Sequence, residues 1–220
     1  MPSPSVHTVE VRRTARVATL GAPDTAATWW LVLHGYGQLA ADFVQHFSPL
    51  VGPDRCVVAP EGLSRFYVDG RASHEQVGAS WMTREDRSHE IADYVAYLDE
   101  TVRSLRSPNP SPSLSVLGFS QGAATASRWA LLGETAVDRL VLWGGAPAPD
   151  LALASHAERL RTMDLTLVVG TDDPYVPDEH RAAVRTRLAR HDIPVSVYTY
   201  EGGHRIDPEA LQRIVADASP

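Results

Sequence analysis

A serine between two glycines is the residue of this sequence best suited to covalent chemistry. Residues 118–122 read Gly-Phe-Ser-Gln-Gly, a G-x-S-x-G pattern in which a strand turns sharply into a helix and exposes Ser120 at the tip. Glycine on both sides removes side chains that would collide where strand and helix cross. The apolar run before the motif and the alanine-rich run at 123–126 fit this context. The alternative is a glycine-rich turn in which Ser120 only caps the helix.

A nucleophilic serine that attacks an acyl group also needs N–H donors for the negative oxygen of the tetrahedral intermediate. An apolar run at residues 29–33 is followed by His-Gly-Tyr-Gly at 34–37. We expect the backbone amide of Tyr36, together with the amide of Gln121 after the nucleophile, to form this oxyanion hole. His34 could be a catalytic base, but its place at the end of the run favours a histidine that shapes the glycine turn.

Such a serine also needs an acid and a base, which follow it along the chain in hydrolases with this type of turn. A buried-type run at residues 165–169 opens into a turn that holds Asp172 and Asp173. This position is the carboxyl end of a strand, where active-site loops gather in open α/β sheets. We expect one aspartate to form the turn and the other to be catalytic, and the residues alone leave the choice open.

The base must be one of four histidines after Ser120, namely His156, His180, His191 and His204. The first three fall within or at the ends of predicted helices. We favour His204, because a glycine-rich loop after the last predicted strand can carry its imidazole back to the serine. His204 would then take the proton of Ser120 during attack on a carbonyl, and water would release the acyl group, without a metal or organic cofactor.

The elements that must position these residues alternate along the chain. Short apolar or β-branched runs predict strands at 6–12, 15–20, 29–33, 56–59, 114–117, 140–143, 165–169 and 195–200. The central runs are almost continuously apolar, as in a mostly parallel sheet that is covered on both faces. Helical patterns occupy the segments between them, so the sequence predicts a three-layer α/β sandwich that forms one domain over residues 1–220.

The helices are predicted from stripes of apolar residues and from local stop signals. They cover residues 89–106, 121–132, 180–191 and 208–216. Ser88 is a candidate N-cap for the first of them, and the prolines at 108–112 should end it. Residues 62–87 show no clear period, and we expect a structured excursion over one end of the sheet.

The composition excludes several classes of function. The 220 residues carry 20 basic and 27 acidic side chains, a formal charge of −7 that disfavours nucleic acid and anionic membrane surfaces as partners. A single cysteine, Cys56, permits no internal disulfide and fits a reducing compartment. We find no signal peptide and no apolar run near the about 20 residues of a membrane span. We therefore expect a cytoplasmic protein that acts on small molecules, and the composition leaves its oligomeric state open.

Four segments together resemble the phospholipase/carboxylesterase family of α/β-hydrolases, which includes acyl-protein thioesterases and small bacterial carboxylesterases. They are residues 33–37, 118–122, 173–177 and 203–204, in the order of the family. The resemblance implies an α/β-hydrolase fold, Ser120 as the nucleophile, His204 as the base and Asp173 rather than Asp172 as the acid. It also implies the amides of Tyr36 and Gln121 as oxyanion donors.

The sequence departs from the family pattern in and after residues 34–37, the segment expected to supply an oxyanion donor and here called the oxyanion loop. The family usually has leucine where Tyr36 stands, and a short aspartate-containing run where this chain has Gln-Leu-Ala at 38–40. These differences bear on the substrate more than on the chemistry.

The segment between the strands predicted at 140–143 and 165–169 has room for one helix and no large cap domain. An open site of this kind suggests short- to medium-chain carboxylic esters or thioesters as substrates. Residues that could line the acyl pocket, or simply pack, are Phe66, Trp81, Met82 and Tyr175. The alternatives are another acyl-group enzyme on the same scaffold, such as a peptidase or acyltransferase, and a non-catalytic binding module. A complete triad in the expected order disfavours the binding module.

Overall fold

The computed structural model describes residues 3–70, 74–106 and 112–216. Its centre is a sheet of seven strands in the order β1-β3-β2-β6-β7-β8-β9. Strand β1 runs antiparallel to β3, and all other neighbours are parallel. The strands are β1 (Val17–Leu20), β2 (Thr28–Leu33), β3 (Arg55–Pro60), β6 (Ser113–Phe119), β7 (Arg139–Trp143), β8 (Asp164–Gly170) and β9 (Ser196–Tyr200).

The middle of this sheet is buried on both faces, as its continuous apolar runs predict. All five residues of β7 and the last five of β2 are buried. Parallel pairing of β2 with β6 places Leu33 opposite Gly118. Because both strands end at the same edge of the sheet, the loop that holds Tyr36 and the turn that holds Ser120 leave the sheet side by side.

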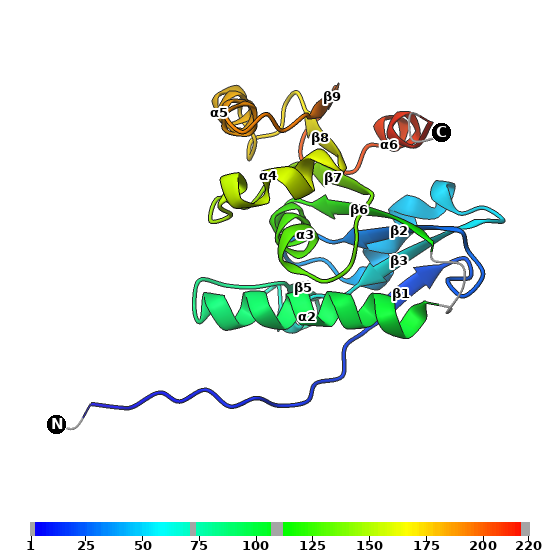
Figure 1. Ribbon diagram of the computed structural model, residues 1–220. Helices are drawn as coiled ribbons and strands as arrows, with labels where there is room; N and C mark the ends of the chain where they lie inside the picture. The colour runs from blue at the N-terminus through cyan, green and yellow to red at the C-terminus, as the bar shows by residue number, and fades with distance from the viewer. Residues whose placement is uncertain (1–2, 71–73, 107–111, 217–220) are drawn as a thin grey trace.

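Helices cover both faces and complete three layers (Figure 1). One face packs against α2 (Arg87–Leu105), α3 (Gln121–Leu132), α4 (Leu153–Arg161) and α5 (Asp178–Ala189). The other face packs against the short α1 (Ala40–Phe43), the 3-10 helix η1 (Val44–Leu50) and α6 (Pro208–Ala216). The predicted three-layer sandwich with a mostly parallel sheet is confirmed, and only α4 occupies the connection from β7 to β8.

Two local predictions were wrong. Residues 6–12 form no strand, because they pair with no other strand in the described part of the chain, and residues 3–14 are all exposed. Ser88 does not cap α2, which begins one residue earlier at Arg87. The residue that precedes this helix is Asp86, in a left-handed conformation with φ of 47° and without a side-chain capping hydrogen bond.

The excursion predicted at 62–87 contains a two-stranded antiparallel sheet of β4 (Ser64–Tyr67) and β5 (Val77–Ser80). Residues 71–73 of this excursion lie outside the described residues, as do 107–111, which include most of the prolines expected to end α2. Among the helices that the structure describes, none combines the length and the apolar character needed to cross a bilayer.

Candidate active site

Ser120 lies at a sharp bend between β6 and α3. Its backbone has φ of 55° and ψ of −116°, a combination that non-glycine residues adopt only where the surrounding structure enforces it. A Cβ on Gly118 would overlap the carbonyl oxygen of Gly122, and a Cβ on Gly122 would overlap that of Leu33. Both glycines are therefore required by the close crossing of strand and helix. The Ser120 side chain forms no capping hydrogen bond, so the reading of this residue as a helix cap is wrong.

An aspartate–histidine pair joins the loops that follow β8 and β9. The Nδ1 atom of His204 lies 2.8 Å from Oδ2 of Asp173. The Asp173 side chain is fully buried, and its Oδ1 accepts a hydrogen bond of 2.9 Å from the amide of Tyr175. Asp172 is exposed. When Nδ1 donates its proton to the carboxylate, the Nε2 atom of His204 is left free to accept one.

The imidazole of His204 lies beside the nucleophile turn. Its ring centroid is 4.7 Å from that of Phe119, the residue before Ser120, and 4.7 Å from that of Tyr175. Gly144 makes room for it, since a Cβ there would lie 2.9 Å from Cε1 of His204. The structure describes both Ser120 and His204, and it shows no hydrogen bond between their side chains. Such bonds are often long in hydrolases without substrate and tighten in the reactive complex.

The loop after β2 leaves one amide available. The amide of Gly35 donates to Oε1 of Gln38 at 2.7 Å, and the amide of Gln38 donates back to the carbonyl of Gly35. The amide of Gly37 donates to the carbonyl of Ala79 at 2.9 Å. The amide of Tyr36 has no partner among the described residues. Of the amides of Gly35, Tyr36 and Gly37, it is therefore the one that has no acceptor in the described part of the chain.

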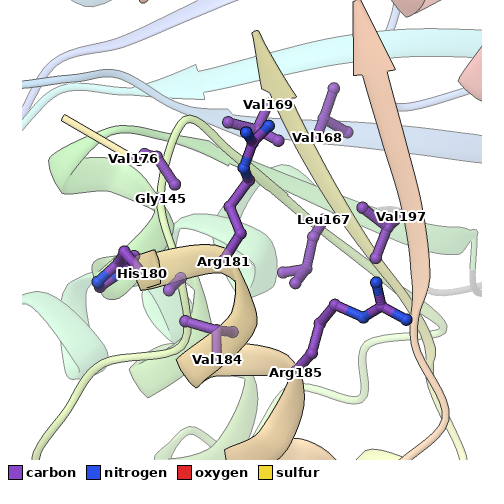
Figure 2. A pocket seen from close by; sticks show the side chains of 11 residues that line it. Gly145, Leu167, Val168, Val169, Val176, His180, Arg181, Val184, Arg185 and Val197 are labelled. Carbon is purple, nitrogen blue, oxygen red and sulfur yellow. The ribbon is translucent and has the colours of Figure 1, made fainter. Parts of the chain in front are cut away.

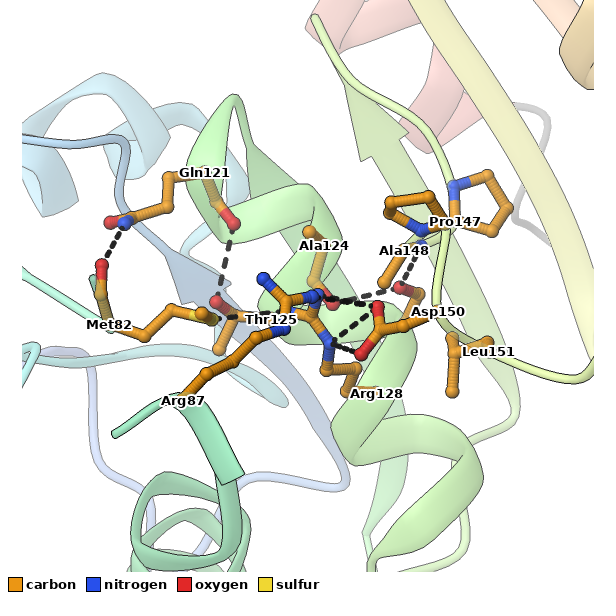
Figure 3. Close-up of polar contacts among 12 residues, drawn as sticks. Met82, Arg87, Gln121, Ala124, Thr125, Arg128, Pro147, Ala148, Asp150 and Leu151 are labelled. Carbon is orange, nitrogen blue, oxygen red and sulfur yellow. Dashed lines mark hydrogen bonds and ion pairs between the residues drawn. The ribbon is translucent and has the colours of Figure 1, made fainter. Parts of the chain in front are cut away.

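Gln121 has a structural role that the sequence did not reveal. As the first residue of α3 it has an amide without an intrahelical acceptor. Its side chain ties the segment after β5 to the turn at residues 118–122. Nε2 donates to the carbonyl of Met82 at 2.8 Å (Figure 3). Oε1 accepts from the amide of Trp81 at 3.1 Å. A glutamine side chain satisfies both because it carries a donor and an acceptor.

His34 shapes the loop at residues 34–37, and backbone groups occupy both of its ring nitrogens. Its Nδ1 lies 2.8 Å from the carbonyl of Gly35, and its Nε2 accepts from the amide of Gly62 at 2.9 Å, which fixes a neutral imidazole. The indole of Trp81 donates to the His34 carbonyl at 2.9 Å. The ring is fully buried, and this burial lowers the pKa of His34. The structure thus agrees with the interpretation of His34 as a residue that holds the turn.

A second polar cluster connects α3 to the loop after β7 and to the start of α2 (Figure 3). The guanidinium of Arg128, only 3% exposed, lies 2.7 Å from the Asp150 carboxylate and 3.2 Å from the Tyr94 hydroxyl. Arg87 lies 3.0 Å from the same carboxylate. Partial burial alone would raise the pKa of Asp150, but the hydrogen bonds from Arg128 and Arg87 outweigh it and hold the pKa at about 2. No local pattern could have shown this cluster, because its members come from distant parts of the chain.

The four predicted pocket residues lie in two different environments. Trp81 and Met82 are 2% and 8% exposed and belong to the core. Phe66 stacks on Tyr36 with ring centroids 5.0 Å apart, and Tyr175, 74% exposed, lies beside His204. Of the four, Phe66 is thus the one in contact with Tyr36, and Tyr175 the one in contact with the His204 imidazole.

A crevice lies between α5 and strands β8 and β9 (Figure 2). Its walls include Leu167, Val184 and Val197, and Arg181 and Arg185 border it. The enclosed volume is about 20 Å³, enough for roughly one water molecule. Ser120, Asp173 and His204 are not part of its lining, and it is too small for an acyl chain.

Cys56 offers no alternative nucleophile. It lies within β3 and is fully buried, and this burial raises the pKa of its thiol to about 12. A thiol with this pKa is almost entirely protonated at neutral pH, and the thiolate is the nucleophilic form.

Comparisons with known proteins bear on the family and the fold. A model of the phospholipase/carboxylesterase family matches residues 17–217. No curated protein sequence matches the chain. Among solved structures, an acyl-protein thioesterase 2 from Zea mays superposes with a TM-score of 0.71 at 20% identity, covering 93% of this chain and 98% of that one. A carboxylesterase from Mesorhizobium loti gives 0.69 at 24% identity, covering 94% and 95%, and one from Bacillus cereus gives 0.65 at 17%, covering 93% and 95%. At these identities the likeness shows the fold alone, which is the α/β-hydrolase fold that the sequence predicted.

Proposed function

Because the chain belongs to the phospholipase/carboxylesterase family of α/β-hydrolases, an esterase-type family, we propose that it hydrolyses short- to medium-chain carboxylic esters or thioesters through Ser120, His204 and Asp173. The observation that carries the proposal is the position of the bonded Asp173–His204 pair. It lies against Phe119, directly before a serine held in a strained turn.

The proposed reaction follows from the atoms that remain available. Nε2 of His204 accepts the proton of Ser120 as Oγ attacks the acyl carbonyl, while Asp173 stabilises the imidazolium that forms. The amides of Tyr36 and Gln121 bind the oxyanion of the tetrahedral intermediate. Its collapse expels the alcohol or thiol with a proton from His204. Water, deprotonated by the same imidazole, then attacks the acyl-enzyme and releases the acid.

The substrate class rests on the surroundings of the serine. The connection from β7 to β8 holds only α4, so no cap domain restricts access from that side. Phe66 and Tyr175 offer aromatic surface next to the oxyanion loop and the imidazole. We leave Trp81 and Met82 out of the proposed pocket because both are core residues. A partly buried Phe66 and an exposed Tyr175 suit an acyl group of modest length that stays partly in water.

A fluorophosphonate probe and a series of p-nitrophenyl esters and acyl thioesters of increasing chain length test the proposal together. We expect labelling of wild-type protein at Ser120, turnover that is fastest for short or medium chains, and neither in Ser120→Ala. Labelling without ester or thioester turnover would replace the proposal with a peptidase or acyltransferase. Absence of both in folded wild-type protein would indicate a binding module and overturn it.

A further inference from the structure

The N-terminal segment is the largest feature that the proposed function does not use. Residues 3–14, here called the arm, extend away from the body of the protein (Figure 1). All twelve are exposed, including Val6 at 91%, Val9 at 83% and Val11 at 82%. Within the described part of the chain, the arm makes no hydrogen bond. Valine and threonine favour strands, so an extended segment of this composition is suited to pair with another strand.

The arm leads directly into an edge of the central sheet. Strand β1 is the terminal strand of that sheet, and β3 is its only partner among the described strands. The pairing starts at Arg16, whose carbonyl accepts the amide of Glu61 at 2.9 Å. The other side of β1 therefore presents unpaired backbone groups, which are a template for a further strand.

We propose that the arms of two copies of this chain pair antiparallel about a two-fold axis at Val11 and join the two sheets into a dimer. In such a pair, the residue n positions before Val11 on one copy lies opposite the residue n positions after Val11 on the other copy. An axis on a residue, rather than between two residues, keeps Val9 and Val11 of both copies on one face. His7 and Arg13 share the face of these valines, at its two ends. The other face carries the polar residues Thr8, Glu10, Arg12 and Thr14, together with Val6.

Charge selects Val11 among the possible axes. With the axis at Val11, Glu10 of each copy lies opposite Arg12 of the partner subunit, so two attractive pairs form. An axis at Glu10 would place two glutamates opposite each other, and an axis at Arg12 would do the same with two arginines, which is destabilising. The segment is thus complementary to itself in this register.

The same register connects the arms to the body. It places Ser5 of the partner subunit opposite Val17, at the start of the free edge of β1. Pro4 then falls at an edge position, where the missing N–H is tolerated. The arm pair is in this way a continuation of two sheets, whereas an isolated two-stranded ribbon would be only marginally stable.

Site-specific cross-linking tests the register. Val11→Cys places two thiols at the axis, and a short bismaleimide should join the two copies efficiently. In the matched control Val6→Cys, the two thiols are separated by ten residues along the pair, about 33 Å at about 3.3 Å per residue, so no cross-link should form. The native Cys56 is fully buried and does not interfere. Equal cross-linking at both positions, or none at Val11→Cys, would overturn the proposal.

Charge reversal tests whether the arm pairs with the arm of a second copy of this chain, and it requires no measurement of activity. The wild type should have twice the chain mass of 24.0 kDa by light scattering. Glu10→Arg and Arg12→Glu should each raise the dissociation constant of the dimer at least about tenfold, and the double variant should restore it. Arg13→Glu, which lies opposite Val9 of the partner subunit, should change it little. Circular dichroism should confirm that each variant is folded. A wild type that stays monomeric at its solubility limit, or a double variant without rescue, would show that the arm does not pair in this way.

Discussion

Asp173 and His204 are 31 residues apart in the sequence, yet Oδ2 of the aspartate lies 2.8 Å from Nδ1 of the histidine. The two residues follow β8 and β9, which are parallel neighbours at one end of the sheet. A backbone hydrogen bond of 2.9 Å from the amide of Asp172 to the carbonyl of Gly202 ties the two loops together. The orientation of the imidazole is therefore set by strand pairing as well as by the carboxylate.

The two adjacent aspartates should differ sharply in their effect on hydrolysis. Asp173→Asn removes the charge that stabilises the imidazolium and favours the wrong tautomer, so we expect kcat for a p-nitrophenyl ester to fall by roughly 10⁴. Asp172→Asn changes an exposed side chain next to it and should leave kcat almost unchanged. Equal losses in steady-state assays of the two variants would contradict this assignment.

Removal of the Tyr36 amide should slow the reaction without removing a side chain from the triad. Tyr36→Pro lacks the N–H that we assign to the oxyanion, and loss of one such donor typically lowers kcat by about 10²–10³. Tyr36→Ala keeps the amide and is the matched control, with an effect on KM through the lost contact with Phe66. Circular dichroism should confirm that both are folded. A similar kcat in the two variants would place the donor elsewhere.

The glycines of the nucleophile turn should be essential for folding. In Gly118→Ala the new methyl group would overlap the Gly122 carbonyl, which is backbone and cannot move aside, so we expect a loss of about 3 kcal/mol or more in the free energy of unfolding. In Gly52→Ala the nearest atom belongs to the flexible Arg55 side chain at 3.5 Å, and the change should stay within about 1 kcal/mol. Urea unfolding compares the two, and a tolerated Gly118→Ala would mean that the turn is looser than the structure shows.

Burial of His34 should make stability depend on pH below neutrality. Burial lowers the pKa of this imidazole from 6.5, so below pH 6.5 the unfolded chain binds a proton that the folded protein does not. The stabilisation from His34 is complete above pH 6.5 and is lost as the pH falls. Between about pH 7.5 and 5.5, the advantage of the wild type over His34→Gln in the free energy of unfolding, measured in urea, should shrink.

His89 provides a control of opposite sign for that experiment. A hydrogen bond with Asp86 raises the pKa of this exposed histidine. Its contribution is present below pH 6.5 and is lost as the pH rises through the raised value. The advantage of the wild type over His89→Gln should therefore grow as the pH falls. If both variants followed the same trend, the sign assigned to His34 would be wrong.

The Arg128–Asp150 pair should matter more for stability than ion pairs on the surface. Asp150→Asn leaves the buried Arg128 guanidinium without its counter-charge and should lower the free energy of unfolding by about 1–3 kcal/mol, moderated by the 39% exposure of Asp150. Glu100→Gln disrupts an ion pair with Arg103 on the surface, in which the side chain of Glu100 is 62% exposed and that of Arg103 is 60% exposed. This variant should change the free energy of unfolding by at most about 0.5 kcal/mol. Denaturant titration of both variants checks the ranking, which equal losses would contradict.

The sequence determined the elements whose pattern is set by neighbours in the chain. The helix Gln121–Leu132 and the strand Arg139–Trp143 were predicted to within one residue at each end, because apolar periodicity and short continuous apolar runs are local properties. The sharp strand-to-helix turn at residues 118–122 was also predictable, since its two glycines reflect a steric demand that arises within five residues. The strand predicted at 6–12 shows the limit of this reasoning. Its alternating valines are the same whether or not a partner strand exists, and only the fold shows that none of the described strands pairs with it.

Tertiary structure decided which groups face each other and which remain free. The residues alone left Asp172 and Asp173 equivalent, and only the pairing of β8 with β9 placed one of them on His204 and the other in solvent. Only the folded loop shows that Tyr36 keeps an unused amide while its neighbours donate to Gln38, Gly35 and Ala79. The physical reason is the same in both cases. A hydrogen bond depends on distance and direction between groups that the chain brings together over many residues, and no local pattern encodes that geometry.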